Sequence, residues 1–238
     1  SLIQHKKEHK LHCNIKPGNK IFYFTTCGWM MWNWLVSCLA SKATIYLYDG
    51  SPFHPSSTFL FDIIEKENIS FFGTGAKYLD YLKQNNINII NNYKLKSLKT
   101  IASTGSPLLH ETFEYVYKKI KKDVHLSSIS GGTDIVSCFV LGNPSKPVYS
   151  GEIQVKGLGM DVDIFDEKGK SLFDSKGELV CKSTFPSKPI FFWDDLKNNK
   201  YFKAYFNKYN NTWHHGDYAK ITKNNGFIIY GRSDATLN

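Results

Sequence analysis

The stretch KTIASTGSPLLHETFEYVYKKIKKDVHLSSISGGTD, residues 99–134, contains the pattern that decides the fold. A predicted strand at 99–103 and a second one at 124–129 are each followed by a turn that contains glycine. Between them, apolar residues recur at the three- and four-residue spacing of an amphipathic helix. Strand, helix and strand in this order predict a right-handed crossover between parallel strands.

The same alternation extends towards the amino terminus. Short β-rich runs predict strands, and the apolar or amphipathic stretches between them predict helices. The predicted strands cover 20–26, 44–48 and 70–73, and the predicted helices cover 30–43, 57–68 and 76–84. We therefore expect an α/β fold with a doubly wound, mostly parallel sheet and helices on both faces.

The pattern changes near residue 150. Short extended runs are now separated by turns of glycine, lysine and asparagine. The runs cover 152–155, 161–165, 177–181, 218–222 and 227–230. This spacing is typical of a small antiparallel β-barrel or a distorted sandwich, which we expect to follow the α/β part.

Composition and charge exclude several classes of protein. Hydrophobic residues form 42% of the 238 residues and charged residues 21%, which is typical of a folded globular chain. The 30 basic residues outnumber the 21 acidic ones and give a formal charge of +9, but Arg232 is the single arginine. Because proteins that read nucleic acids depend on arginine for bidentate contacts, we expect no nucleic-acid partner.

Cysteine spacing indicates the redox compartment, and hydropathy indicates whether the chain crosses a membrane. The five cysteines form no Cys-x-x-Cys pair, which argues against zinc and a disulfide framework and favours a reducing compartment, the cytosol. The longest uncharged apolar stretch, 28–40, contains Asn33 and Ser37 and is shorter than the roughly 20 residues of a membrane span. We therefore expect no membrane-spanning segment.

Two turns at the carboxyl ends of predicted strands are candidate ligand sites, because ligands of doubly wound sheets bind at that edge. One reads STGSP at 103–107 and the other SISGGTD at 128–134. Paired glycines let a backbone approach a base or a phosphate, Thr133 supplies a hydroxyl, and Asp134 supplies a hard oxygen suited to Mg²⁺. Each turn taken alone is equally consistent with ordinary turn and capping chemistry.

Two later turns carry charged residues. HHGD at 214–217 places Asp217 where a carboxylate is able to bind both hydroxyls of a ribose. GRSD at 231–234 contains Arg232, and a guanidinium in a chain that otherwise uses lysine indicates a bidentate contact with phosphate. Two hairpin turns are the simpler interpretation of both motifs.

Taken together, these motifs resemble a known family. In order they are GSP at 105–107, SGGTD at 130–134, GEL at 177–179, HGD at 215–217 and GRSD at 231–234. Their order and spacing resemble those of adenylate-forming acyl-CoA synthetases over essentially the whole chain. GWMMWNW at 28–34, LYDGSP at 47–52 and GRSDATLN at 231–238 are most similar to the members that act on acetoacetate.

The resemblance implies a two-step ligase that uses ATP, Mg²⁺ and CoA. ATP and acetoacetate give an acyl-AMP intermediate and pyrophosphate, and the thiol of CoA then displaces AMP. It also implies an AMP-binding domain, with its α/β part at 1–150 and its small β subdomain at 151–230. The start of a hinge is implied at 231–238.

The family's binding roles fall on matching positions of this sequence. The residues implied to bind ATP or AMP are Gly105, Ser106, Pro107, Ser128, Ile129, Ser130, Gly131, Gly132, Thr133, Asp217 and Arg232. The first three would line the adenine, Thr133 would lie near the α-phosphate, and Asp217 would hold the ribose. Asp134 stands where the family commonly has glutamate and would serve Mg²⁺, and Asp234 would lie at the hinge.

The acyl pocket implied by the resemblance consists of Trp29, Met30, Met31, Thr104 and Gly131. A relative that takes acetate has tryptophan in place of Gly131, so glycine is expected to lengthen the pocket by a second carbonyl unit. Thr104 is expected to donate a hydrogen bond to the 3-keto oxygen, whereas Trp32 and Trp34 are expected to pack in the core.

The resemblance also implies parts that lie outside these 238 residues. The loop that closes on the pyrophosphate would precede Ser1, and the domain with the adenylation lysine would follow Asn238. We therefore expect the chain alone to be inactive and at best a weak nucleotide binder. Two alternatives stay open: a synthetase for another short acid such as acetate or 3-hydroxybutyrate, and a truncated remnant that binds nucleotides without catalysis.

Overall fold

The first sheet of the molecule consists of five parallel strands. The computed structural model describes residues 1–234. The strands are β1 (Lys20–Tyr23), β2 (Thr44–Tyr46), β3 (Phe71–Gly75), β4 (Thr100–Thr104) and β5 (His125–Ser128). They pair in the order β2-β1-β3-β4-β5, so the chain reverses its winding direction between β1 and β3. The predicted doubly wound parallel sheet is confirmed.

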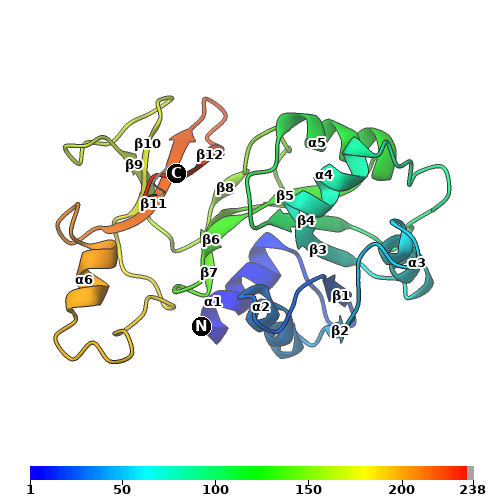
Figure 1. Cartoon of the computed structure of the whole chain (residues 1–238), viewed down its shortest axis with the longest axis horizontal. Coiled ribbons are helices and arrows are strands. Elements are labelled where there is room, and N and C mark those ends of the chain that lie inside the picture. Colours follow the sequence, from blue (N-terminus) through cyan, green and yellow to red (C-terminus); the bar gives the residue numbers. More distant parts are fainter. Residues whose placement is uncertain (235–238) are drawn as a thin grey trace.

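Helices cover both faces of this sheet, because successive side chains of a buried strand point to opposite faces. Phe22 and Phe72 face one core, and Ile21 and Phe71 face the other. The first core contains α3 (Phe59–Lys66), α4 (Ala76–Gln84), α5 (His110–Tyr115) and its π-helical continuation η3 (Val116–Ile120). The second contains α2 (Met31–Ser37) and the start of the 3₁₀ turn η2 (Cys38–Ser41). In Figure 1, α4 and α5 lie above the sheet and α1 and α2 below it.

Residues 2–12 are helical although the sequence analysis predicted no element there. Helix α1 (Leu2–Lys7) continues directly as the π-helix η1 (Glu8–His12). Their sequence, LIQHKKEHKLH, has no apolar stripe, yet Gln4, Glu8 and His9 are buried. A buried polar face escapes a hydrophobic pattern because its stability depends on hydrogen-bond partners that only the tertiary structure supplies.

Some predicted boundaries move by a few residues. The helix predicted at 30–43 is α2 followed by η2, and it ends at Lys42, whose φ of 58° is left-handed. The helix predicted at 57–68 is shorter at both ends, whereas the one predicted at 76–84 coincides with α4.

A three-stranded antiparallel sheet follows the parallel one. Its strands are β6 (Ser130–Gly132), β7 (Ser137–Leu141) and β8 (Val155–Lys156), in the order β6-β7-β8. The sequence predicted a turn at 130–132, but these residues are extended and pair with β7 across a bulge. Strand β8 lies after residue 150, so this sheet contains strands from both sides of the boundary predicted there between the α/β part and the β subdomain. That boundary stays a prediction.

The last sheet has four antiparallel strands in the order β12-β11-β10-β9. They are β9 (Val162–Phe165), β10 (Gly177–Cys181), β11 (Trp213–Ile221) and β12 (Phe227–Arg232). Helix α6 (Asn199–Tyr205), which the sequence did not predict, packs on this sheet through Tyr205, whose ring stacks on Trp213 with 3.7 Å between centroids. The two antiparallel sheets share one core that contains Phe139, Leu179 and Phe227.

No helix in the described part of the chain is a candidate membrane span. Across residues 1–234, none of the helices combines the length and the apolar character that crossing a bilayer requires.

Candidate active site

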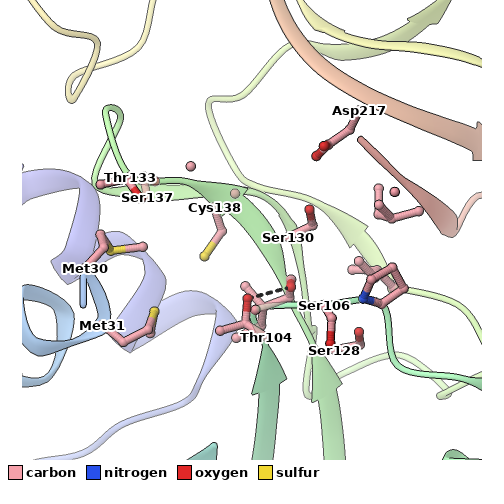
Figure 2. A pocket seen from close by; sticks show the side chains of 18 of the residues that line it. Met30, Met31, Thr104, Ser106, Ser128, Ser130, Thr133, Ser137, Cys138 and Asp217 are labelled. Carbon is pink, nitrogen blue, oxygen red and sulfur yellow. Dashed lines mark hydrogen bonds between the residues drawn. The ribbon is translucent and has the colours of Figure 1, made fainter. Parts of the chain in front are cut away.

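A pocket of about 340 Å³ lies beyond the carboxyl ends of the parallel strands. The segments that follow β1, β4 and β5 form one side of it, and β7, β11, β12 and Ile153 contribute the rest. This is the edge at which the sequence analysis placed the ligand. Figure 2 shows the pocket, with Met30 and Met31 on one side and Asp217 on the other.

Every residue predicted to bind the nucleotide or the acyl group lines this one pocket. They are Trp29, Met30, Met31, Thr104, Gly105, Ser106, Pro107, Ser128, Ile129, Ser130, Gly131, Gly132, Thr133, Asp217 and Arg232. The fold thus brings together motifs that are far apart along the chain. The role of each residue stays a prediction.

The predicted metal and hinge residues lie just outside the pocket. Asp134 is exposed and lines an adjoining pocket of about 260 Å³ together with Thr133 and Arg232. The hydroxyl of Tyr205 donates to Asp134 Oδ2 at 2.5 Å. Asp234 contacts Arg232, and the remainder of the predicted hinge, 235–238, lies outside the described residues.

Residues that the sequence analysis did not select complete the lining, and all but Ile153 lie in strands. They are Ser137, Cys138, Ile153, Ile229 and Gly231. Except for Gly231, which stands in the GRSD motif, they carry no motif of their own. The available signal is that SCFVL at 137–141 follows the SGGTD turn closely, so the strand it forms has to pass the site.

Asp217 and Arg232 are the only charged side chains that line the pocket within residues 1–234. Arg232 Nη1 donates to Asp217 Oδ1 at 3.2 Å, and Arg232 Nε donates to Asp234 Oδ1 at 2.9 Å. Burial raises the pKa of Asp217 to about 6, although the charge of Arg232 opposes the rise. Hydroxyl donors from a ligand would stabilise this poorly solvated carboxylate, which suits it to a ribose.

His215 connects the glycine-rich strand to β11, a role that the sequence analysis did not assign. Its Nε2 donates to the carbonyl oxygen of Gly131 at 3.0 Å. Burial lowers the pKa of His215 to about 4, so the ring is uncharged at neutral pH. The 3.6 Å contact between His215 Nε2 and Asp217 Oδ2 is therefore no ion pair. A β-carbon on Gly132 would lie 2.7 Å from His215 Cε1, so a side chain at 132 would push the ring away.

Thr104 is already hydrogen-bonded in the structure. Its hydroxyl donates to the carbonyl oxygen of Ile129 at 2.9 Å. Because a threonine has one hydroxyl proton, donation to a 3-keto oxygen requires this contact to break first. In the observed geometry Thr104 offers a ligand an acceptor rather than the expected donor.

Gly131 has no room for a side chain. A β-carbon there would lie 2.0 Å from the carbonyl oxygen of Ser137 and 2.7 Å from Cys138 Cα. Both atoms belong to the backbone of β7 and are unable to rotate away. The expected effect of glycine on the length of the acyl pocket stays a prediction, and in this structure a side chain at 131 would first displace β6 from β7.

Two of the three tryptophans near residue 30 lie where they were expected. Trp29 lines the pocket, and Trp34 is buried in the core behind it. Trp32 is half-buried and does not line the pocket.

The doubly wound sheet and the pocket at its edge, to which four of the five motifs contribute residues, match the chain to the adenylate-forming acyl-CoA synthetases. Within that class, the sequence is homologous along its whole length to acetoacetyl-CoA synthetases. The acetoacetyl-coenzyme A synthetase of Rhizobium meliloti (strain 1021) is 55% identical over 238 residues, and the Gallus gallus protein is 52% identical over 239. The solved structure of acetoacetyl-CoA synthetase from Streptomyces lividans matches with a TM-score of 0.93 at 40% identity.

The chain spans little more than a third of the length of these relatives. All of the chain is covered, but only 37% of the Rhizobium meliloti protein, 36% of the Gallus gallus protein and 37% of the Streptomyces lividans chain. No family model matches the chain. The predicted resemblance and fold class are confirmed.

Proposed function

We propose that this chain forms the acyl- and nucleotide-binding part of an AMP-forming ligase that joins acetoacetate to CoA. The observation that carries the proposal is the single pocket that contains every predicted binding residue, in a chain 55% identical to an acetoacetyl-coenzyme A synthetase. Acetoacetate, ATP and CoA are the proposed substrates. Neither a nucleic acid nor a membrane has a role in the proposal.

The chemistry divides into two displacements. A carboxylate oxygen of acetoacetate attacks the α-phosphorus of ATP, and the bond to pyrophosphate breaks. The sulfur of CoA then attacks the acyl carbon, the bond to AMP breaks, and the thiol proton leaves to solvent. Both steps use one enclosed acyl-adenylate, so the protein's main task is to hold that molecule in a fixed orientation.

The pocket offers a distinct surface to each part of this molecule. Asp217 would accept hydrogen bonds from the ribose hydroxyls, and the lining segment from Gly105 to Pro107 would face the adenine. The backbone of β6 at Gly131 and Gly132 lines the pocket and would run along the phosphate. Met30 and Met31 offer thioether and methylene groups to the acyl chain.

The residues present fit one Mg²⁺ ion held jointly with ATP. Within residues 1–234, no group of three or more acidic, histidine or cysteine side chains is arranged to hold a metal. Mg²⁺ commonly binds through one or two carboxylates and the phosphates of the substrate. Asp134 is exposed at the pocket edge, and Tyr205 bonds only its Oδ2. The ion would neutralise phosphate charge there.

We expect Mg²⁺ to strengthen ATP binding by the chain and Asp134→Asn to remove most of that gain. Calorimetric titration of ATP with and without Mg²⁺ measures it. Tyr205→Phe is the matched control, because it removes the hydrogen bond to Asp134 but keeps the carboxylate. An Asp134→Asn chain that retains the full Mg²⁺ effect contradicts the metal assignment.

The cysteines are consistent with a reducing compartment, and we propose the cytosol. All five are free thiols, and four of them are buried. A disulfide framework is therefore not what stabilises this fold.

The chain is expected to bind an acyl-adenylate without turning over ATP. A non-hydrolysable acetoacetyl sulfamate of adenosine should bind about tenfold or more tightly than AMP, because its acyl arm adds burial worth about 1.4 kcal/mol or more. Pyrophosphate release should be undetectable, since no lysine lines the pocket within residues 1–234.

The same titration distinguishes the alternatives. Tighter binding of the acetyl or the 3-hydroxybutyryl sulfamate indicates a synthetase for that acid. Equal affinity for AMP and all acyl sulfamates indicates a remnant that binds only the nucleotide. Measurable pyrophosphate release shows that the chain is catalytic by itself.

A further inference from the structure

Glu8 is a carboxylate buried behind the pocket, and none of the predicted motifs includes it. Its relative exposure is 0%, and it is the first residue of η1, where α1 becomes a π-helix. A buried carboxylate is costly unless several donors compensate for its lost hydration. Short π-helical insertions frequently occur at functional sites. The burial of Glu8 and its place at the start of a π-helix therefore need an explanation.

Its two oxygens receive hydrogen bonds from two different elements. Trp34 Nε1 of α2 donates to Glu8 Oε2 at 3.0 Å. Ser137 Oγ of β7 donates to Glu8 Oε1 at 2.5 Å, and the backbone N–H of Cys138 approaches the same oxygen at 3.4 Å. Gln4, one turn earlier in the helix, also donates to Ser137 Oγ, at 2.9 Å. The carboxylate therefore ties α2 to β7.

Both of these elements are walls of the pocket. Ser137 and Cys138 line it directly, and so do Met30 and Met31, one turn before Trp34. Glu8 itself does not line the pocket. In Figure 2, Met30, Met31 and Cys138 lie on the side of the pocket away from Asp217. Glu8 thus acts on the walls opposite the proposed ribose site.

Met30 and Met31 contribute flexible side chains to this end of the pocket. Methionine side chains have three rotatable bonds and adapt to irregular spaces, so they set the width of a pocket poorly. A carboxylate held by donors from two walls is rigid, because moving either wall breaks a charge-assisted hydrogen bond.

We propose that Glu8 is a positioning residue that holds α2 and β7 at the separation which the acyl arm of the ligand requires. The inference rests on the proposed function, since only an acyl-adenylate extends into this end of the pocket. Glu8 touches no ligand. Its effect is confined to the acyl part of binding, and the nucleotide part depends on other segments.

Glu8→Gln is the sharpest test, because it keeps the shape of the side chain but turns one oxygen into an N–H₂ group. That group then faces a donor, either Trp34 Nε1 or Ser137 Oγ. We expect the chain to bind the acetoacetyl sulfamate of adenosine about tenfold more weakly, while its affinity for AMP stays within about twofold. Calorimetric titration of both ligands and a melting curve are measured on the same preparation.

Two further variants keep the test decisive. Glu65→Gln is the matched control, because Glu65 accepts backbone hydrogen bonds from Lys94 and Leu95 and does not line the pocket. Both of its affinities should stay unchanged. Trp34→Phe removes the indole donor but keeps an aromatic ring, and it should weaken the acyl sulfamate selectively by about threefold to tenfold. This variant decides the matter if Glu8→Gln does not fold.

The outcomes separate the two levels of the proposal. If Glu8→Gln weakens AMP and the acyl sulfamate equally, or weakens neither, Glu8 has only a structural role and the inference is overturned. Selective loss of acyl sulfamate binding supports it. If the unsubstituted chain does not distinguish the acyl sulfamate from AMP, the proposed function fails, and the inference fails with it.

Discussion

Replacing Gly131 with alanine is expected to destabilise the chain by about 3 kcal/mol and to abolish binding of the acyl-adenylate. The new β-carbon would lie 2.0 Å from the carbonyl oxygen of Ser137, far inside van der Waals contact. The obstacle is strand backbone, so relief requires β6 to separate from β7. That movement also pulls the carbonyl oxygen of Gly131 away from His215 Nε2, which donates a hydrogen bond to it at 3.0 Å.

Denaturant unfolding and ligand titration of the Gly131→Ala chain measure both effects. Gly28→Ala is the matched control, because no atom lies within 4 Å of a β-carbon at that exposed position. The control should differ from the unsubstituted chain by no more than about 0.5 kcal/mol. A Gly131→Ala chain as stable as the control would show that β6 does not pair as described.

Replacing Asp217 with asparagine is expected to weaken nucleotide binding and to strengthen the fold. The amide loses the charge-assisted hydrogen bonds to the ribose, worth about 1.5–3 kcal/mol, which corresponds to about tenfold to a hundredfold in affinity. In the ligand-free chain, however, the buried charge of Asp217 is itself destabilising, because burial raises its pKa from 3.8 to about 6. Asparagine removes that cost, which is at most about 3 kcal/mol.

The stability gain depends on pH with a definite sign. Below about pH 4, Asp217 is protonated in the folded and the unfolded chain, so the two proteins should be equally stable. Between about pH 4 and 6 the unfolded chain releases the Asp217 proton while the folded chain retains it, so the asparagine variant becomes progressively more stable, and above pH 6 the difference levels off. The lowered pKa of His215 makes the folded chain more stable as pH rises, which is the opposite direction. It does so in both proteins, so to first order it cancels in the difference between their unfolding free energies.

Unfolding free energies at pH 4, 6 and 8, together with AMP titrations, test this prediction. Asp49→Asn, at an exposed position, is the control for loss of one negative charge. An Asp217→Asn chain that binds AMP as well as the unsubstituted chain would reject the ribose assignment. A stability difference that does not grow between pH 4 and 8 would reject the pKa shift.

Local pattern was sufficient to predict the fold class. The helix at 76–84 and the strand at 177–181 were predicted with the bounds that the structure has, because their apolar residues follow a regular period between clear turn signals. The strand–turn positions of STGSP and SISGGTD were sufficient to predict the edge of the sheet where the pocket lies.

The amino-terminal helix could not be predicted from the hydrophobic pattern of the sequence. Glu8 and Gln4 are buried without any apolar stripe, since their partners Trp34 and Ser137 are distant in sequence. The residues predicted as a turn at 130–132 form strand β6, because the two glycines hide the alternation that indicates a strand.

By itself, the sequence determined the class of fold and the strand edge that holds the site, because these depend on local periodicity and on turns at strand ends. The family resemblance of its motifs implied most of the residues that line the pocket. The tertiary structure alone decided how those residues are used. It engaged the hydroxyl of Thr104 with Ile129, left no space beside Gly131, and raised the pKa of Asp217. Each of these depends on burial and on contacts between distant segments, and no local pattern encodes such contacts.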